Sequence, residues 1–244
     1  MKYYAIIPAR YASQRFPGKA LALLKGKPII QHVYERVAES ALFDRVIIAT
    51  DDARIQTISQ SFGAEAVMTD PALPSGTDRV AAVARDLPED SVIANIQGDE
   101  PLITKEPLAR LLKEFEDDRV QMASLMTSLE SAEDMANPNI VKLVIDRFSN
   151  ALYFSRQAIP YDRDNAGGFT AYRHIGVYAF RYHTLMDFVA LPVAKLERIE
   201  KLEQLRALEN GIPIRMVLSS YQGTGIDTPQ DLKRVESIMA KELS

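Results

Sequence analysis

Short runs of β-branched and apolar residues alternate with longer amphipathic stretches through the first half of the chain. The runs predict five strands, at Tyr3 to Ile7, Arg45 to Thr50, Ala64 to Met68, Ser91 to Ile96 and Gln121 to Thr127. Between them, apolar residues recur three or four positions apart, which is the spacing of a helix with one buried face. The helical faces are Ile29 to Val37, Ile55 to Phe62 and Leu108 to Phe115. This alternation is typical of an α/β fold with a mainly parallel sheet.

The hydrophobic pattern changes after Asn137-Pro138, where strand-like runs follow one another without a helical pattern between them. The segments are Ile140 to Ile145, Ala151 to Phe154, a polar loop from Arg156 to Arg173, and His174 to Phe180. We interpret the stretch at about 137–190 as a lobe inserted into the α/β core. Because no linker separates independent parts, residues 1–244 are predicted to form a single domain.

The last third of the chain predicts two helices around one more strand. A helix from Leu196 to Asn210 is expected to end at Gly211, with Pro213 just beyond it. Its apolar residues recur every third position, so the apolar stripe winds around the helix and should be covered on more than one side. A strand from Ile214 to Leu218 and a helix from Pro229 to about Lys241 complete the prediction.

Composition excludes several classes of protein. The 244 residues are 47% hydrophobic and 25% charged, as in ordinary globular proteins. Lysine and arginine number 29 against 33 acidic residues, and the resulting net charge of −4 favours neither nucleic acid nor an anionic membrane as a partner. The chain has no cysteine and no apolar window of roughly 20 residues, so we expect a cytoplasmic protein without disulfides or a membrane span.

A basic loop follows the first predicted strand. Arg10, Arg15 and Lys19 fall within the twelve residues from Pro8 to Lys19, which include no acidic residue. Ligands of open α/β sheets gather at the carboxyl ends of the strands, and arginine and lysine both bind phosphate oxygens. The loop therefore predicts a polyphosphate site, with a solvated basic loop as the alternative.

Two other phosphate-binding motifs are excluded by position. A Walker A loop ending at Gly18-Lys19 needs glycine at position 13 and serine or threonine at position 20, where this chain has Ser13 and Ala20. A dinucleotide fingerprint needs its glycines after the first strand, but Gly223-Thr224-Gly225 lies near the C-terminus. The chain is therefore neither a P-loop protein nor a typical hydride-transfer enzyme.

Two aspartates follow predicted strands in distant parts of the sequence. Asp99 lies in Gln97-Gly98-Asp99-Glu100-Pro101, and Asp227 precedes the proline that begins the last helix. Either alone is explained by a helix cap, but together they predict a site for a divalent cation bridging nucleotide phosphates. Ser75-Gly76-Thr77 could similarly cap a helix or let a flat ligand approach the backbone.

Several motifs taken together resemble the CMP-Kdo synthetases, which are 3-deoxy-manno-octulosonate (Kdo) cytidylyltransferases. The matching segments are Ile6 to Arg10 through Gly18-Lys19, Ala49 to Asp52, Ser75 to Arg79, Asn95 to Pro101, Tyr153 to Arg156, His174 to Tyr178, Leu202 to Arg206 and Gly225 to Pro229. They run in order from about residue 3 to about residue 240, so the resemblance covers essentially the whole chain.

The resemblance implies a Rossmann-like, three-layer nucleotidyltransferase with an inserted lobe for dimerisation and sugar binding. Such an enzyme transfers CMP from CTP to the anomeric hydroxyl of Kdo, releases pyrophosphate, requires Mg²⁺ and serves lipopolysaccharide biosynthesis. The implied partners are CTP and Kdo as substrates and a second copy of the chain in a homodimer.

Roles for individual residues also come from this resemblance. The residues expected to face the triphosphate are Arg10, Ser13, Arg15 and Lys19, and those expected to read the base are Ser75, Gly76 and Arg79. The expected metal ligands are Asp99 and Asp227, and the catalytic residues are these two aspartates with Arg10, Arg15 and Lys19. The acceptor sugar is expected to contact Gln97, Arg156, His174, Tyr178, Glu203 and Gln204, with Gln97 also on the nucleotide side.

Simpler interpretations of some of these residues stay open. His174 and Tyr178 lie four positions apart in a predicted strand, so both are also explained as packing residues on one face. Glu203 and Gln204 are also explained as the exposed side of a helix. Asp51 and Asp52 are interpreted as turn and cap residues without a chemical role.

The function has two alternatives. An 8-amino analogue of Kdo or another acidic sugar would be a different acceptor for the same chemistry, although Glu100 and Gly225 favour ordinary Kdo within the resemblance. A non-catalytic nucleotide-binding module is the alternative from another class. The presence of Lys19, Asp99 and Asp227 argues against it.

Overall fold

The computed structural model describes residues 1–12, 15–129, 131–164 and 167–242. The chain forms two compact units, Met1–Leu108 with Gly223–Ser244, and Ala109–Gln222. The lobe predicted at about 137–190 lies inside the second unit. The single domain expected for residues 1–244 stays a prediction.

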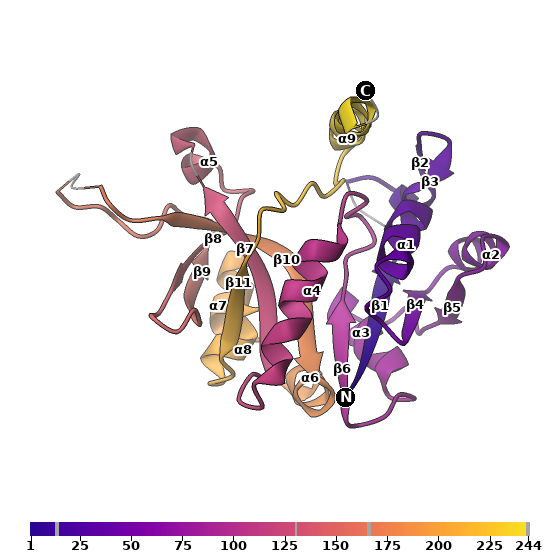
Figure 1. Ribbon diagram of the computed structural model, residues 1–244, viewed down its shortest axis with the longest axis horizontal. Helices are drawn as coiled ribbons and strands as arrows, with labels where there is room; N and C mark the ends of the chain where they lie inside the picture. The colour runs from indigo at the N-terminus through magenta and orange to yellow at the C-terminus, as the bar shows by residue number, and fades with distance from the viewer. Residues whose placement is uncertain (13–14, 130, 165–166, 243–244) are drawn as a thin grey trace. The chain divides into compact units, whose positions relative to one another are not determined.

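Four parallel strands make up the sheet of the first unit (Figure 1). They are β1 (Lys2–Ala9), β4 (Arg45–Thr50), β5 (Glu65–Met68) and β6 (Ser91–Asn95), in the order β6-β1-β4-β5. Ile6 in the middle of β1 pairs with Ile47 on one side and Asn95 on the other. The predicted strands are confirmed to within two residues at their ends, as is the α/β class.

Helices connect and follow these strands along the chain. They are α1 (Ile29–Glu39), α2 (Ala53–Ser61), α3 (Gly76–Ala84) and α9 (Pro229–Glu242), while α4 (Lys105–Lys113) runs from the first unit into the second. Ile29, Ile30 and Val33 of α1 have no exposed surface. Asp52 caps α2 by accepting the Arg54 N–H at 2.9 Å, which confirms the prediction that Asp52 is a cap.

Small elements connect β1 to α1. The loop after β1 leads into a 3-10 turn, η1 (Lys19–Leu21), and a two-stranded ribbon, β2 (Leu23–Leu24) with β3 (Lys27–Pro28). Gly18, just before η1, has φ of 70°, a left-handed conformation that favours glycine. Its N–H donates to the Tyr11 carbonyl at 2.9 Å, so the basic loop folds back upon itself before Lys19.

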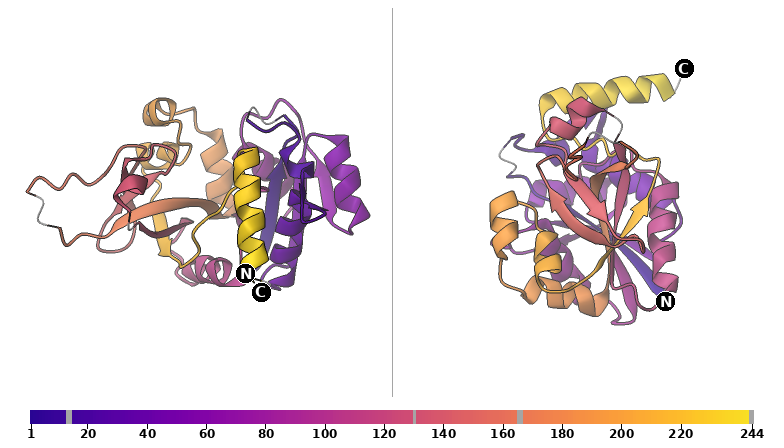
Figure 2. Two further views of the ribbon diagram at one scale, coloured as in Figure 1. Left: turned by 90° about the horizontal axis from the view of Figure 1, so that it is seen from above. Right: turned by 90° about the vertical axis from the view of Figure 1, so that its left-hand side faces the viewer.

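The second unit is built mainly on antiparallel strands. They are β7 (Met122–Leu129), β8 (Lys142–Ile145), β9 (Ala151–Ser155), β10 (Ala171–Arg181) and β11 (Ile214–Leu218). β10 pairs with β7 and β8, and β8 pairs with β9, all antiparallel, whereas β11 is parallel to β7. The described residues between β9 and β10 form an arm that extends away from the strands (Figure 2). β10 begins three residues earlier than predicted, within the expected polar loop.

Short helices complete the second unit. They are η2 (Glu114–Glu116), α5 (Ala132–Ala136), α6 (Tyr182–Ala190), α7 (Lys195–Glu200) and α8 (Leu205–Glu209). The hydrophobic pattern did not predict α5 and α6. α6 follows β10 directly and buries Leu185 and Phe188.

The prediction of a single helix from Leu196 to Asn210 is wrong, because this segment forms two helices, α7 and α8. Lys201 has φ of 55°, a left-handed conformation that ends α7 before α8 begins. Apolar residues at every third position cannot all lie on one face of a straight helix, and the break separates them. Leu202 and Leu205 are buried as a result, whereas Ile199 on α7 is 68% exposed.

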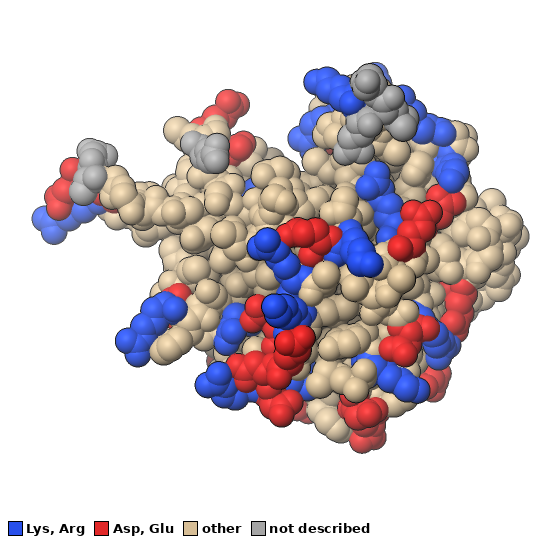
Figure 3. All heavy atoms as spheres, viewed as in Figure 1, with Lys and Arg blue, Asp and Glu red and all other residues tan. Residues whose placement is uncertain are grey.

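Surface charge is mixed on the face of the molecule in Figure 3, where basic and acidic side chains are interspersed. No helix in the described ranges has the length and apolar character required to cross a bilayer.

Candidate functional site

A cavity of about 270 Å³ lies at the carboxyl ends of β1 and β6 in the first unit. This is the edge at which parallel sheets bind ligands. The cavity is lined by Pro8, Ala9, Arg10, Ala12, Lys19, Ala20, Gly76, Gln97, Gly98 and Asp99. The structure therefore brings together the basic loop, the residues after β6 and the first residue of α3, as the sequence predicts.

Gly98 allows the two strand ends to approach each other. A Cβ atom at this position would lie 2.9 Å from the Pro8 carbonyl oxygen and 3.2 Å from Ile30. Any larger residue would push the loop carrying Asp99 away from β1. The glycine in Gln97-Gly98-Asp99 thus positions the aspartate as well as lining the cavity.

Lys19 lies between the two predicted metal ligands. Its Nζ atom is 2.5 Å from Asp99 Oδ2 and 3.1 Å from Asp227 Oδ1. The Ile226 N–H donates to the Asp99 carbonyl at 2.9 Å, so a backbone hydrogen bond also joins the two segments. Two aspartates 128 positions apart in the sequence thus share one ammonium group.

The charge of Lys19 is stabilised by these neighbours. Burial alone would lower the pKa of Lys19, but the carboxylates of Asp99 and Asp227 outweigh burial and raise that pKa above its usual value. Arg15 adds a second cation, with Nη2 at 2.8 Å from Asp227 Oδ2. The site therefore holds two carboxylates already neutralised by two basic side chains.

The two carboxylates fit a divalent cation that takes its other ligands from a substrate. Across the described ranges, no cluster of three or more His, Cys, Asp or Glu side chains could hold a metal. Asp99 and Asp227 nevertheless both approach the Lys19 Nζ atom, so a cation can be held by both. Mg²⁺ commonly takes one or two carboxylates and completes its shell with phosphate oxygens and water.

The predicted base-binding residues differ in their environments. Ser75 caps α3, accepting the Asp78 N–H at 3.0 Å and donating to Asp78 Oδ2 at 2.6 Å. Gly76 lines the cavity, and a Cβ there would meet Pro8 at ordinary contact distances. Gly76 is therefore not demanded by protein packing, and its lack of a side chain leaves room for a ligand.

Arg79 is fully buried and belongs to an ion pair. Its Nη2 is 2.8 Å from Asp51 Oδ2 and its Nη1 donates to Thr69 Oγ1. Burial lowers the pKa of Arg79 although Asp51 opposes that effect. The proposed contact of Arg79 with a base stays a prediction, and Asp51, interpreted from the sequence as a turn residue without chemistry, is the partner of this buried charge.

The other predicted nucleotide residues lie on the cavity or outside the described residues. Arg10 donates to the Pro74 carbonyl at 3.0 Å, and Gln97 donates to Asn95 Oδ1 at 3.1 Å. Both line the cavity. Ser13 lies outside the described residues.

Four of the predicted sugar residues form a cluster in the second unit. His174 and Tyr178 of β10 have ring centroids 5.3 Å apart, and Gln204 Nε2 is 3.5 Å from His174 Nδ1. The Glu203 carboxylate is close enough to Tyr178 to raise its pKa. These contacts gather an imidazole, a phenol, an amide and a carboxylate, all of which can bind sugar hydroxyls.

Both ring side chains of the cluster stay neutral. Desolvation lowers the pKa of His174 to about 3, and desolvation, helped by Glu203, raises the pKa of Tyr178 well above its usual value. Phe154 encloses the imidazole from another side, with ring centroids 5.1 Å apart. Neither ring of the cluster therefore carries a charge.

Replacing His174 by Gln should make the protein less sensitive to acid. The unfolded chain protonates His174 near pH 6.5, whereas the folded chain does so near pH 3. Between these values the unfolded state binds more protons, so the free energy of unfolding falls as pH decreases, by a few kcal/mol at most. Urea unfolding at pH 7.5 and 5 should show a smaller decrease in the variant than in the wild type.

The matched control for this experiment is His183→Gln, because His183 is exposed on α6. This control should keep the pH dependence of the wild type. An unchanged pH dependence in His174→Gln would contradict the neutral, desolvated imidazole.

Arg156 makes a different set of contacts from those expected of a sugar-binding arginine. Its guanidinium donates to the carbonyls of Glu200 at 2.8 Å, Pro138 at 3.0 Å and Lys201 at 3.4 Å. Its backbone N–H donates to the Glu200 carboxylate at 3.0 Å. Arg156 thus caps the carbonyls at the end of α7, at the break before Glu203 and Gln204, and direct contact with the sugar stays a prediction.

Two residues that support the segment around Arg156 were not predicted from the sequence. Glu200 accepts from Ser155 Oγ at 2.7 Å as well as from Arg156. Lys142 is fully buried on β8, and its Nζ donates to the carbonyls of Asn137, Ile140 and Arg156 at 2.6 to 2.8 Å. Neither side chain lies in a recognisable motif, so only its packing reveals its role.

The predicted residues therefore fall into two groups. Arg10, Arg15, Lys19, Ser75, Gly76, Gln97, Asp99 and Asp227 belong to the first unit, and Arg156, His174, Tyr178, Glu203 and Gln204 belong to the second. Arg79 lies in the first unit but is buried away from solvent.

Comparison with known proteins identifies close relatives. A family model described as cytidylyltransferase matches residues 4–216. The chain is 50% identical to a 3-deoxy-manno-octulosonate cytidylyltransferase of Thermodesulfovibrio yellowstonii, over 96% of each chain. It is 48% identical to one of Syntrophobacter fumaroxidans, over 99% of this chain and 98% of the relative.

A solved structure shares the same fold. That structure is of a CMP:2-keto-3-deoxy-manno-octonic acid synthetase complexed with CTP, and it matches this chain with a TM-score of 0.94 and 42% identity. The match covers 99% of this chain and 100% of that protein. The similarity therefore extends through both units.

Proposed function

Because the chain belongs to the cytidylyltransferase family, we propose that it transfers CMP from CTP to the anomeric hydroxyl of Kdo and releases pyrophosphate. The observation that carries this proposal is the identity of 48 to 50%, over nearly the whole chain, to relatives named for this reaction. The pairing of Lys19 with Asp99 and Asp227 beside the strand-end cavity supports a phosphate-transfer site.

The basic side chains would bind the triphosphate of CTP. Arg10 and Lys19 line the cavity, and Arg15 reaches Asp227 beside Lys19. In nucleotidyl transfer the sugar oxygen attacks the α-phosphorus as the bond to pyrophosphate breaks, so negative charge grows on the leaving group. Cations already in position stabilise that charge without reorganising during the reaction.

Asp99 and Asp227 would hold Mg²⁺, which supplies positive charge at the α-phosphate and lowers the pKa of a bound hydroxyl. Lys19 is the counter-ion of both carboxylates. A cation taking its place would free the ammonium group of Lys19 for phosphate oxygens. The lysine would thereby bind the aspartates in one state and the nucleotide in the other.

The acceptor sugar would be bound by the cluster in the second unit. Tyr178 and Gln204 supply neutral hydrogen-bonding groups suited to hydroxyls, and the neutral His174 ring contacts Gln204. Arg156 would support them by holding the end of α7 next to Glu203 and Gln204. A direct contact between Arg156 and the sugar carboxylate would need N–H donors of the guanidinium that already donates to the carbonyls of Glu200 and Lys201.

Turnover with different nucleotides tests the proposed function. With Kdo and Mg²⁺ present, pyrophosphate release should be fastest with CTP and much slower with ATP, because the proposed base residues are assigned to cytosine and not to a purine. UTP differs from CTP at only a few hydrogen-bonding atoms, so weak use of UTP is compatible with the proposal. Equal kcat/KM for ATP and CTP would contradict the base assignment.

The same assay separates the alternatives. Release of pyrophosphate with 8-amino-Kdo or a sialic acid, but not with Kdo, would identify a different acceptor for the same chemistry. Binding of CTP without turnover with any acidic sugar would instead indicate a non-catalytic nucleotide-binding module. Faster turnover with Kdo than with these analogues is the result that we expect.

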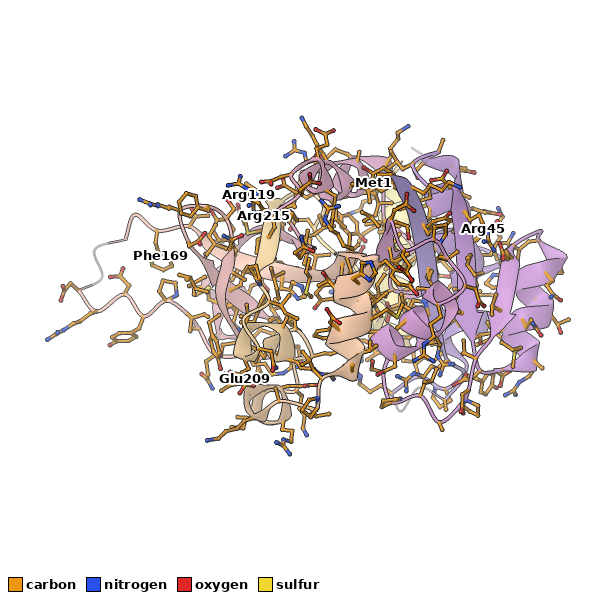
Figure 4. The ribbon with its side chains drawn as sticks, turned by 90° about the horizontal axis from the view of Figure 1, so that it is seen from below. Met1, Arg45, Arg119, Phe169, Glu209 and Arg215 are labelled. Atoms are coloured by element: carbon orange, nitrogen blue, oxygen red, sulfur yellow. The ribbon has the colours of Figure 1, made fainter. Side chains whose placement is uncertain are left out.

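The proposed product would serve lipopolysaccharide biosynthesis, and we place the enzyme in the cytoplasm as a homodimer. The absence of cysteine is compatible with a reducing compartment. The arm between β9 and β10 exposes Tyr161 at 87% and Phe169 at 44%. Phe169 is labelled on this arm in Figure 4. Exposed aromatic side chains on an extended segment favour a contact with a second copy.

A further inference from the structure

Ser124 lies at an irregular point of the second unit's sheet. Strands β7 and β10 run side by side (Figure 1). Their pairing shifts between Ile175 and Tyr178, which leaves Gly176 and Val177 without partners in the register. Ser124 is the β7 residue opposite Tyr178, and its side chain is completely buried. A buried hydroxyl beside such a bulge must be satisfied by protein groups.

Three groups surround the Ser124 hydroxyl. Its Oγ atom is 2.9 Å from the Val177 carbonyl oxygen, 3.3 Å from the Ile175 carbonyl oxygen and 2.9 Å from His174 Nε2. Carbonyl oxygens can only accept, so the single hydroxyl proton is directed to them, and the Val177 oxygen is the nearer. The remaining contact requires His174 Nε2 to donate and Ser124 Oγ to accept.

This arrangement determines where the imidazole proton resides. Desolvation keeps His174 neutral by lowering its pKa to about 3, so the ring carries a single N–H. With that proton on Nε2, the Nδ1 atom presents a lone pair. Gln204 Nε2 approaches this lone pair at 3.5 Å and acts as its donor.

The orientation of the Gln204 amide follows from its contact with the His174 Nδ1 lone pair. Its NH₂ end faces His174, so its carbonyl oxygen is the end that His174 does not engage. Gln204 is nearly buried, with 4% of its surface exposed, and the amide therefore has little freedom to rotate without losing this partner. A ligand meeting the amide carbonyl is offered an acceptor, which suits a hydroxyl group.

We propose that Ser124 is a positioning residue that sets the tautomer of His174 and, through it, the direction of the Gln204 amide. The site then presents an acceptor oxygen to a hydroxyl of the acceptor sugar. The sugar part of this inference rests on the proposed function. The tautomer part depends on the protein alone.

Nitrogen NMR of the uniformly ¹⁵N-labelled protein measures the tautomer directly. The chain has three histidines, so comparison with His174→Gln identifies the His174 signals. The wild type should show a neutral His174 ring with its proton on Nε2. A wild-type ring protonated on Nδ1 would overturn the proposal, whether or not any variant of Ser124 folds.

Ser124→Ala tests whether the serine causes this state. Loss of the acceptor should allow a population with the proton on Nδ1, whereas Thr127→Val should leave the ring unchanged. Thr127 is a matched control because it is a buried hydroxyl residue on the same strand, and its Oγ1 contacts Gln222 rather than His174. An unchanged tautomer in Ser124→Ala would also overturn the proposal.

Kinetics test the consequence for the sugar. Ser124→Ala should raise KM for Kdo roughly three- to tenfold, the scale of one neutral hydrogen bond, and leave KM for CTP near the wild-type value. In a Gln204→Met background, the serine change should have no further effect on KM for Kdo, because there is no amide to orient. A full additional effect in that background would contradict the relay through Gln204.

The two hypotheses fail in different ways. Absence of pyrophosphate release from CTP and Kdo by the wild type would reject the proposed function, while the NMR result would still decide the role of Ser124. Normal turnover with an Nδ1-protonated His174 would reject the role of Ser124 alone.

Discussion

Asp99→Asn and Asp227→Asn should each lower kcat by roughly two or more orders of magnitude while the protein stays folded. Asparagine retains the shape of aspartate but removes the charge that would hold a divalent cation. Both carboxylates reach the same point, now taken by Lys19 Nζ at 2.5 and 3.1 Å, so losing either leaves a single charged ligand. Steady-state pyrophosphate release over a range of Mg²⁺ concentrations is the measurement.

Asp90→Asn is the control for this pair, because Asp90 is an exposed aspartate of the same unit. It should keep wild-type turnover, and thermal unfolding should confirm that all three variants are folded. Both metal-site variants should need more Mg²⁺ for half-maximal activity. Near-normal turnover of both at low Mg²⁺ would mean that the cation is held by other residues.

Lys19→Met should also lower kcat by roughly two orders of magnitude, but through the phosphates rather than the cation. Methionine preserves much of the aliphatic stem and removes the ammonium group. If Lys19 stabilises charge that grows during transfer, kcat falls more than KM for CTP rises. Since the variant retains both aspartates, its requirement for Mg²⁺ should not increase.

Lys105→Met is the corresponding control, because Lys105 is exposed at the start of α4. It should have wild-type kcat and KM. A Lys19→Met enzyme with normal kcat and a raised KM for CTP would show that the lysine binds the nucleotide equally in the ground and transition states. That result would remove Lys19 from the catalytic group and leave it as a binding residue.

Arg79 and Arg156 show where a motif predicts position better than it predicts contacts. Both are placed by the sequence at ligand-binding positions, yet Arg79 pairs with Asp51 in the interior and Arg156 caps the end of α7. Arginine presents five N–H donors, and folding can direct them to protein acceptors that lie far away in the sequence. The spacing of residues within a motif therefore cannot predict which acceptors its arginine will contact.

The sequence by itself determined the strands of the first unit, the basic loop and the two strand-end aspartates. These are local signals, because alternation, turn residues and charge can be read within ten or twenty positions. The break at Lys201 was not determined locally. An apolar residue at every third position is compatible with one winding helix or two short ones, and burial of Leu202 and Leu205 decided between them.

Only the tertiary structure decided which groups form hydrogen bonds and ion pairs with one another. Asp99 and Asp227 meet at Lys19 because β1 and β6 end at the same edge and a backbone hydrogen bond joins Ile226 to Asp99. Ser124 meets His174 because the pairing of β7 with β10 shifts beside it. Hydrogen bonds and ion pairs act over about 3 Å, and such proximity between distant residues exists only after strands pair and side chains are buried.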